Sequence, residues 1–508
     1  MNVRRGLVAG CVLTAIVRVP AAPLPRSAPE AQGVDSAGVL ALVGALEARV
    51  HFVHSVMLLR HGQVVAEGWW SPYAPDDVHI LYSVTKTFVS TAVGFAAQEG
   101  KLSVDDKVLS FFPDLDPAHP APQMLNMRVR DLLRMSTGHE HDSIPLLRAS
   151  PGGAWTRAFL AAAVEFKPGT HFLYDSGGAY MLAAIVQRVT GMTVEAYLEP
   201  RLFQPLGIRR HPWGLSPEGV DLGDGGLSLR TEDLAKFGQF YLQRGMWNGR
   251  QLLAQRWIDA ASSLQTSNGS DPNGNWDQGY GYLIWLNKGG GYRADGALGQ
   301  FCFVFPAYDA VLAVTSGTSD LAGLMDTVWK FLPPAFHYVP LPPNGAAREA
   351  LRRKLSSLAL PVQAGASASP REAALSLQPF RLEPNERGLR SVAIDFSGAE
   401  PVVLLEDAGG RHAIRCGLGK WLRGRTDFYP RISDMWAQKD SGIAACAAWA
   451  DPDTFVAQLC FDETPYILTC RFHFEGSRLD LSLDNPIRWE TALRHLEIRG
   501  EAAPRGQL

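Results

Sequence analysis

The stretch Leu81–Phe88, LYSVTKTF, contains a serine and a lysine three positions apart, Ser83 and Lys86. A serine hydroxyl becomes a good nucleophile only when a nearby base takes its proton and donors hold the resulting oxyanion. Residues i and i+3 share one face of a helix, so Lys86 can lie beside Ser83. Roughly one or two S-x-x-K matches are expected by chance in a chain of this length. The surroundings must therefore distinguish a nucleophile from two ordinary helix residues.

The residues that follow Ser83 predict a buried helix. From Val84 to Gln98 the sequence is apolar on nearly all sides, and Gly100 suits a C-terminal cap. Ser83 then lies at the helix N-terminus, where backbone N–H groups and the helix dipole favour negative charge. Burial lowers the pKa of a lysine and so allows it to accept a proton. These features favour a nucleophile with its base, the alternative being an N-cap serine and a solvated lysine.

The neighbouring segments predict an antiparallel sheet with a helical insertion. Residues 36–49 have apolar positions at helical spacing, and 53–60 and 63–70 have the pattern of a β-hairpin. Further helices are expected at 152–165, 178–191, 231–244, 251–262 and 318–332, and strands at 281–287, 299–306 and 310–316. Because strands lie at both ends of this region, the sheet is expected to combine its N- and C-terminal parts.

Composition divides the chain into four parts. Residues 1–25 resemble a signal or leader segment, which favours export to the periplasm or the medium and leaves a cytoplasmic location open. Residues 35–333 form the predicted main domain. Residues 334–375, rich in Pro, Ala and Ser, predict a linker. Residues 376–508 contain short alternating segments separated by turn residues, which predict a small all-β domain.

Charge and cysteine usage exclude several classes of protein. Lys plus Arg number 48 against 51 for Asp plus Glu, so no basic field favours nucleic acid. The six cysteines form no C-x-x-C pair, and those near the C-terminus are either isolated thiols or, after export, a disulfide. The run GHEHD at 138–142 contains metal-ligand types but has no partner cluster, which favours a polar loop. No metal, organic cofactor or membrane span beyond the leader is predicted.

A second motif, FLYDSGG, follows Ser83 by about ninety residues and contains Tyr174, Asp175 and Ser176. With the S-x-x-K element it resembles the serine β-lactamase/penicillin-binding-protein superfamily, specifically its class C-like branch of esterases, D-aminopeptidases and amide hydrolases. The segments DLLRMSTGH, KPGT and GMTVEAYLEPRLFQPLGI match the same branch, and the resemblance covers about 35–333. It implies an α/β (α+β) fold of the β-lactamase/transpeptidase type, in which helices flank an antiparallel sheet, with the all-β domain added at the C-terminus.

The resemblance also implies roles for these residues. Ser83 would attack an ester or amide carbonyl, and Tyr174 would take its proton while Lys86 lowers the pKa of the tyrosine. Ser176 would either assist catalysis or cap the next helix. Asp175 is expected to be structural.

The third motif departs from the family pattern. The usual K-T-G or H-x-G is replaced by ADG at 294–296, which has no Lys or His in first place. Gly296 would allow close approach of substrate, and the backbone N–H near Ala297 would be an oxyanion donor. Arg293 is the candidate for the missing positive charge, and Gln300 for a hydrogen-bonding group in the cleft. The departure favours esterase- or amidase-like activity over penicillin turnover.

The sequence thus predicts a serine hydrolase that acts through an acyl-enzyme on ester or amide bonds of a small molecule or peptide. The alternative is a penicillin-binding or sensing module that is acylated but not turned over. Five tryptophans could line a pocket, although such residues most often pack in the core. They are Trp69, Trp70, Trp155, Trp213 and Trp285.

Overall fold

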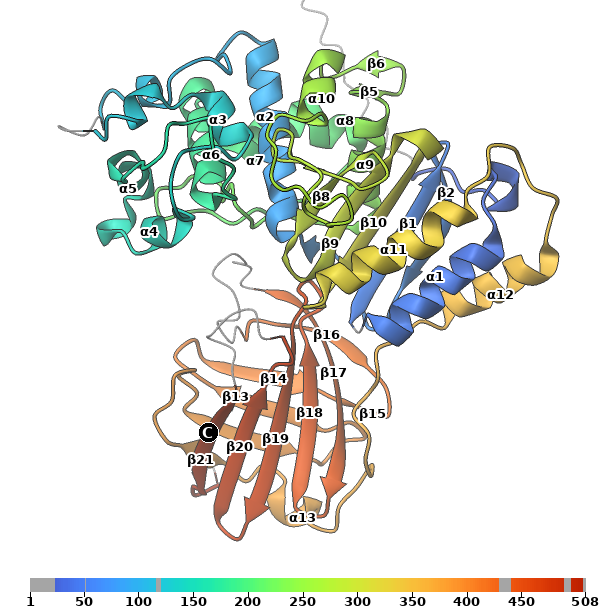
Figure 1. Cartoon of the computed structure of the whole chain (residues 1–508). Helices are drawn as coiled ribbons and strands as arrows, with labels where there is room; N and C mark the ends of the chain where they lie inside the picture. The colour runs from blue at the N-terminus through green and yellow to red at the C-terminus, as the bar shows by residue number, and fades with distance from the viewer. Residues whose placement is uncertain (1–22, 51, 116–119, 429–439, 488–494, 506–508) are drawn as a thin grey trace, which may run out of the picture.

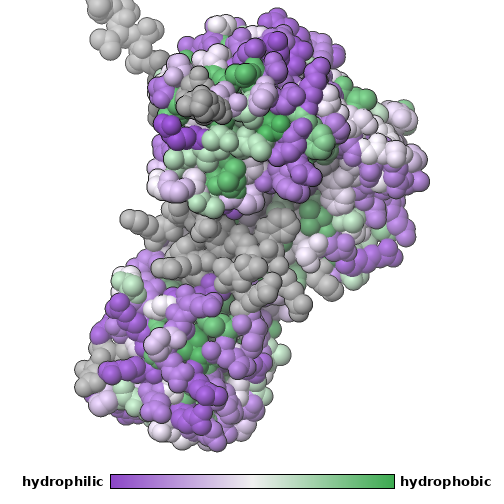
Figure 2. Space-filling model, turned by 60° about the vertical axis from the view of Figure 1, so that its left-hand side comes forward, coloured by the Kyte–Doolittle hydropathy of each residue, from purple (hydrophilic) through white to green (hydrophobic). Residues whose placement is uncertain are grey.

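The computed structural model describes residues 23–50, 52–115, 120–428, 440–487 and 495–505 (Figure 1). Most of the predicted leader 1–25 lies outside these residues, and export remains a prediction. In the described part of the chain, no helix is both long and apolar enough to cross a bilayer. On the face drawn in Figure 2, hydrophilic residues predominate and hydrophobic ones form small separate patches.

Six antiparallel strands form the sheet of the main domain, in the order β2-β1-β10-β9-β8-β7 among the described residues. Their bounds are β1 (Val53–Arg60), β2 (Gln63–Trp69), β7 (Trp285–Leu286), β8 (Tyr292–Gly296), β9 (Gln300–Phe305) and β10 (Ala310–Ser316). The first hairpin pairs with β10, so the sheet combines segments about 250 residues apart, as expected. The predicted strand at 281–287 is shorter than expected, with only two residues in β7.

Helices cover both faces of this sheet (Figure 1). Helices α1 (Ser36–Arg49) and α11 (Leu321–Ala335) pack on one face and α9 (Thr231–Leu242) on the other. Along β9, Phe301, Phe303 and Phe305 join the core beneath α1 and α11, whereas Cys302 and Val304 join the opposite core. Because alternate side chains point to opposite faces, a strand covered on both faces is apolar throughout.

The helical region lies beside the sheet and is centred on α2 (Thr85–Gln98), which packs against α6 (Ser176–Thr190). Shorter helices surround them: α3 (Val129–Leu133), α4 (Ile144–Arg148), α5 (Trp155–Ala161), α7 (Val194–Leu198), α8 (Gln204–Leu206) and α10 (Gln255–Ala261). Twelve of the fourteen residues of α2 are buried, in agreement with its predicted all-round apolar character. The helix expected at 152–165 is shorter, because the backbone becomes extended at Ala162.

The C-terminal domain is an eleven-stranded sheet in the described residues, with the order β14-β13-β12-β11-β21-β20-β19-β18-β17-β15 and β16 beside β17. Its strands are β11 (Phe380–Leu382), β12 (Ser391–Asp395), β13 (Val402–Glu406), β14 (Arg411–Arg415), β15 (Gly417–Leu418), β16 (Leu422–Thr426), β17 (Ser441–Asp451), β18 (Thr454–Cys460), β19 (Ile467–Glu475), β20 (Arg478–Asp484) and β21 (Leu496–Ala502). Because β14 also approaches β16, the sheet nearly closes into a barrel around an apolar core. The all-β prediction is confirmed.

The segment 334–375, expected to be a linker, contains helix α12 (Gly345–Ser356), which packs against α1 and β2. Leu351 of this helix is 2% exposed. Gly68 of β2 permits the contact, since a Cβ there would lie within 3 Å of the side chains of Leu355 and Leu358. The leucines at helical spacing, rather than the Pro and Ala content, determine the structure of this segment.

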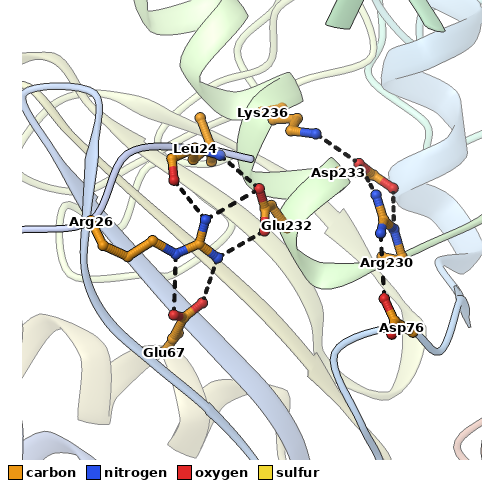
Figure 3. Close-up of polar contacts among 8 residues, drawn as sticks. All are labelled: Leu24, Arg26, Glu67, Asp76, Arg230, Glu232, Asp233 and Lys236. Atoms are coloured by element: carbon orange, nitrogen blue, oxygen red, sulfur yellow. Dashed lines mark hydrogen bonds and ion pairs between the residues drawn. The ribbon is translucent and has the colours of Figure 1, made fainter. Parts of the chain in front are cut away.

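The segment before α1 is fixed to the main domain by charge (Figure 3). Arg26 lies between Glu67 of β2 and Glu232 of α9, at N–O distances of 2.9 Å and 2.8 Å. The backbone N–H of Leu24 also donates to Glu232. The described cysteines Cys302, Cys416, Cys446, Cys460 and Cys470 are all buried free thiols.

Candidate active site

A cavity of about 370 Å³ lies where the six-stranded sheet meets the helical region. Its lining includes five of the predicted site residues: Ser83, Lys86, Tyr174, Ser176 and Ala297. A larger hollow of about 580 Å³ lies on the C-terminal domain, lined mainly by residues around β11 and β12. We assign the site to the smaller cavity because it contains the nucleophile and base candidates.

Ser83 and Lys86 contact each other directly. Ser83 lies in a 3-10 turn, Tyr82–Val84, immediately before α2, and Lys86 lies in the first turn of that helix. The Nζ atom of Lys86 is 2.9 Å from Ser83 Oγ and donates a second hydrogen bond of 2.8 Å to the backbone carbonyl of Asp224. Burial lowers the pKa of Lys86 to about 8, because the ammonium loses its hydration. Near neutral pH the Lys86 amine is therefore uncharged in a fraction of the molecules.

Tyr174 lies beside both Lys86 and Ser83. Its ring centroid is 5.0 Å from Lys86 Nζ, and its ring stacks on Trp285 at a centroid distance of 5.4 Å. Burial raises the pKa of Tyr174 above its usual value, and a hydrogen bond to Ser83 offsets only part of this effect. Tyr174 therefore keeps its proton at neutral pH.

The loop GHEHD supports the N-terminus of α6. The Asp175 carboxylate is fully buried and accepts hydrogen bonds from Thr137 Oγ1, from His139 Nδ1 and from the backbone N–H and hydroxyl of Ser143, at 2.6–3.0 Å. Within the described residues, no cluster of three or more metal-ligand types occurs. These contacts agree with the structural role expected of Asp175.

Ser176 begins α6 and borders the cavity. Its backbone N–H donates to Asp142 Oδ1 at 2.8 Å, and Asp142 also lines the cavity. Burial raises the pKa of the Asp142 carboxyl. Ser176 is thus fixed through its backbone.

The end of β8 closes the cavity opposite α2. A Cβ on Gly296 would lie 2.3 Å from the Leu81 carbonyl oxygen and 3.2 Å from the backbone nitrogen of Val84. Only glycine permits this strand to approach the turn that carries Ser83. Ala297 follows and lines the cavity.

Two predicted substrate-binding residues lie elsewhere. Arg293 is 0% exposed and pairs with Asp295 at 3.0 Å, with further hydrogen bonds to Asn287 and Asn275. It therefore lies behind the cavity wall as the partner of Asp295, and its charge is already neutralised there. Gln300 is also 0% exposed, and its amide bonds the backbone of Ser316 in both directions. The same amide donates to the carbonyls of Ala297 and Leu298, which fixes the turn after β8.

Sequence reasoning missed several residues of the cavity wall. Arg148 and Asp224 form an ion pair of 3.1 Å in the wall, and Trp276 also lines the cavity. Trp276 precedes an acidic residue in a glycine- and asparagine-rich loop, and no local pattern marks it for the cavity. Of the five tryptophans considered, Trp285 lines the cavity, whereas Trp70, Trp155 and Trp213 are buried in the hydrophobic cores and Trp69 packs against one.

The family model described as Beta-lactamase matches residues 46–330, more than half of the chain, and the chain therefore belongs to the β-lactamase family. It is 27% identical over 288 residues to the 6-aminohexanoate-dimer hydrolase of Paenarthrobacter ureafaciens, covering 52% of this chain and 72% of that relative. It is 29% identical over 190 residues to the lovastatin esterase of Penicillium rubens, covering 33% of this chain and 47% of the esterase.

A solved structure named "Putative 6-aminohexanoate-dimer hydrolase from Bacillus anthracis" has the same fold. It superposes with a TM-score of 0.51 at 18% identity, over 64% of this chain and 90% of that chain. These relatives are hydrolases by name, and one of them is an esterase. The chain thus belongs with the β-lactamase-related hydrolases.

Proposed function

We propose that the chain is a serine hydrolase that cleaves ester or amide bonds through an acyl-enzyme on Ser83. The observation that carries this proposal is the 2.9 Å contact between Lys86 Nζ and Ser83 Oγ inside the cavity. A nucleophile within hydrogen-bond distance of a base of lowered pKa is the arrangement that activated serines require.

We assign the proton acceptor to Lys86 rather than to Tyr174. Burial moves the two pKa values in opposite directions, so that neutral Lys86 is a better base than the tyrosine, which would first have to lose its own proton. Neutral Lys86 accepts the Ser83 proton while Oγ bonds to the carbonyl carbon and the π electrons move to the carbonyl oxygen. The backbone N–H groups of Ser83 and Ala297 are our candidates for holding that oxyanion.

Collapse of the tetrahedral intermediate breaks the bond to the leaving group. The departing alcohol or amine takes the proton that Lys86 accepted. Tyr174, which is neutral, can donate a hydrogen bond beside it. Water then attacks the acyl-Ser83 ester and gives up a proton to Lys86. The bond between the acyl carbon and Ser83 Oγ breaks, Lys86 returns the proton to Oγ, and the acid is released.

The cavity supports a preference for small substrates without a strongly bound carboxylate. Its volume of about 370 Å³ suits a small molecule or a short peptide end. Arg148 already pairs with Asp224, and Arg293 lies behind the wall, so neither is an uncommitted partner for a substrate anion. We therefore expect neutral esters and amides to react faster than cephalosporins.

The test is burst and steady-state hydrolysis of p-nitrophenyl esters beside a chromogenic cephalosporin, with intact-mass detection of an acyl adduct. Ser83→Ala should lose at least about 10³-fold in kcat and form no adduct. Ser90→Ala is the matched control, because Ser90 is a fully buried serine of the same helix outside the cavity lining. An adduct without turnover would favour the sensing module, and full activity in Ser83→Ala would refute the mechanism.

A further inference from the structure

The loop that joins β18 to β19, Phe461–Tyr466, is buried against the main domain. Its sequence, FDETPY, has the composition of an exposed hairpin turn. Nevertheless Asp462, Glu463 and Thr464 are each 2% exposed or less. Figure 1 shows this end of the C-terminal sheet directed toward the six-stranded sheet.

The buried carboxyl groups of this loop have ion-pair partners from both domains. Glu463 pairs with Arg210 of the main domain at 2.6 Å, and Asp462 pairs with Arg423 at 3.0 Å. Since buried carboxylates are tolerated only when paired, the loop is built for a docked position rather than for solvent. Tyr73 of the main domain also donates its hydroxyl to the Thr464 carbonyl at 2.8 Å.

The loop contacts the residues directly before the nucleophile. The backbone N–H of Ile80 donates to the Glu463 carbonyl at 3.0 Å. Two residues later, the Tyr82 hydroxyl donates to the Tyr466 hydroxyl at 2.8 Å. Ser83 is the next residue in the chain.

Tyr82 needs such support because its backbone is in a disfavoured region. Its φ is 46°, in the left-handed region that bulky residues rarely adopt, and such a conformation persists only where the surroundings fix it. The Tyr82 side chain is 2% exposed and lies in the apolar cluster formed by the C-terminal sheet, with Tyr466 and Leu468.

The opposite side of the cavity contacts the same cluster. Leu298, in the turn after Gly296 and Ala297, has a φ of 61°, is 0% exposed and packs in this cluster. The core of the C-terminal domain therefore touches both the turn that carries Ser83 and the turn that carries the second oxyanion donor.

We propose that Tyr466 is a positioning residue for Ser83 and that the loop Phe461–Tyr466 makes the C-terminal domain part of the catalytic scaffold. This inference rests on the proposed function. The Tyr82–Tyr466 contact and the shared cluster fix the turn at Tyr82, and this turn sets the direction of Ser83 Oγ toward Lys86. The C-terminal domain thereby acts on the reaction without touching substrate.

The test compares acylation of the full-length Tyr466→Phe, Tyr82→Phe and double variants with that of Tyr241→Phe. Tyr241 is the matched control, because its hydroxyl is also 2.8 Å from another buried hydroxyl, that of Thr91, but lies outside the cavity lining. Stopped-flow bursts with a p-nitrophenyl ester give the acylation rate, steady-state kinetics give KM, and thermal unfolding gives Tm.

We expect Tyr466→Phe and Tyr82→Phe each to acylate about tenfold more slowly, and the double variant to acylate no more slowly than the slower single variant. KM should stay unchanged in Tyr466→Phe, because Tyr466, unlike Tyr82, lies outside the cavity lining. Tyr241→Phe should lower Tm comparably and keep the wild-type acylation rate. If Tyr466→Phe acylates as fast as Tyr241→Phe while wild-type acylation depends on Ser83, the positioning role is refuted and the proposed function stands. If wild type forms no adduct at Ser83, both are refuted.

Discussion

Lys86 should set the pH dependence of hydrolysis. Only its neutral form accepts the Ser83 proton, and burial lowers its pKa to about 8. A base with that pKa is about one-tenth neutral at pH 7 and about nine-tenths neutral at pH 9. We therefore expect kcat/KM for a neutral ester to rise about tenfold between these pH values and then to level off.

The assay follows a p-nitrophenyl ester at the isosbestic wavelength of p-nitrophenol, with the rate in the presence of Ser83→Ala subtracted. Lys86→Arg keeps the positive charge but cannot accept a proton, so we expect a loss of about 10²–10⁴-fold at every pH. Lys236→Arg is the control, because Lys236 is also buried, 3% exposed, but pairs with Asp233 at 3.3 Å. It should keep the wild-type profile.

The same pKa shift predicts an effect on stability. A decrease from 10.5 to about 8 corresponds to a cost of about 3 kcal/mol for the charged form. Between about pH 8 and 10.5 the unfolded chain binds more protons than the folded one, so the stability of wild type should rise with pH there. Below pH 8 the full cost is present. Urea unfolding should show inactive Lys86→Met at least as stable as wild type at pH 7, with the difference shrinking toward pH 10.

Two outcomes would contradict this reasoning. A pH profile that is flat from 7 to 9, or that rises only near pH 10, would remove Lys86 as the base. An active Lys86→Arg variant would do the same, because the guanidinium supplies charge without a base.

Two further substitutions test residues that support the site. Gly296→Ala places a Cβ 2.3 Å from the Leu81 carbonyl, so acylation should fall at least about tenfold, whereas Gly44→Ala, with no atom within 4 Å, should keep full activity. A normal burst in Gly296→Ala would show that the close approach is dispensable. For Asp175, burial raises the pKa, but hydrogen bonds from His139 and Ser143 outweigh it and hold the pKa below its usual range. Its stabilisation is therefore present above the unfolded pKa and lost as pH falls through the folded one. Asp175→Asn should lower the free energy of unfolding by roughly 3–5 kcal/mol at pH 7 and by less at pH 3, measured by urea unfolding; an equal loss at both pH values would contradict the assignment.

The sequence alone determined the elements whose signals are local. Helices α1 and α2 and the hairpin β1–β2 follow from apolar periodicity and begin or end within a residue or two of the predicted positions. The spacing of Ser83 and Lys86 at the start of a buried helix was sufficient to predict their contact. Alternating segments likewise predicted the C-terminal strands, because a strand that is covered on one face has an apolar residue at every second position.

Which charged residues and loops contact each other is visible only in the tertiary structure. Arg293 has the right type and place in sequence for a substrate anion, yet its side chain points behind the wall to Asp295. Arg148 reaches the cavity from a helix that no catalytic pattern marks. The loop Phe461–Tyr466 lies almost four hundred residues from Ser83 in sequence and contacts the residues beside it. Periodicity specifies which face of a segment is buried but not which distant segment covers it, and the partner is fixed only when the whole chain packs.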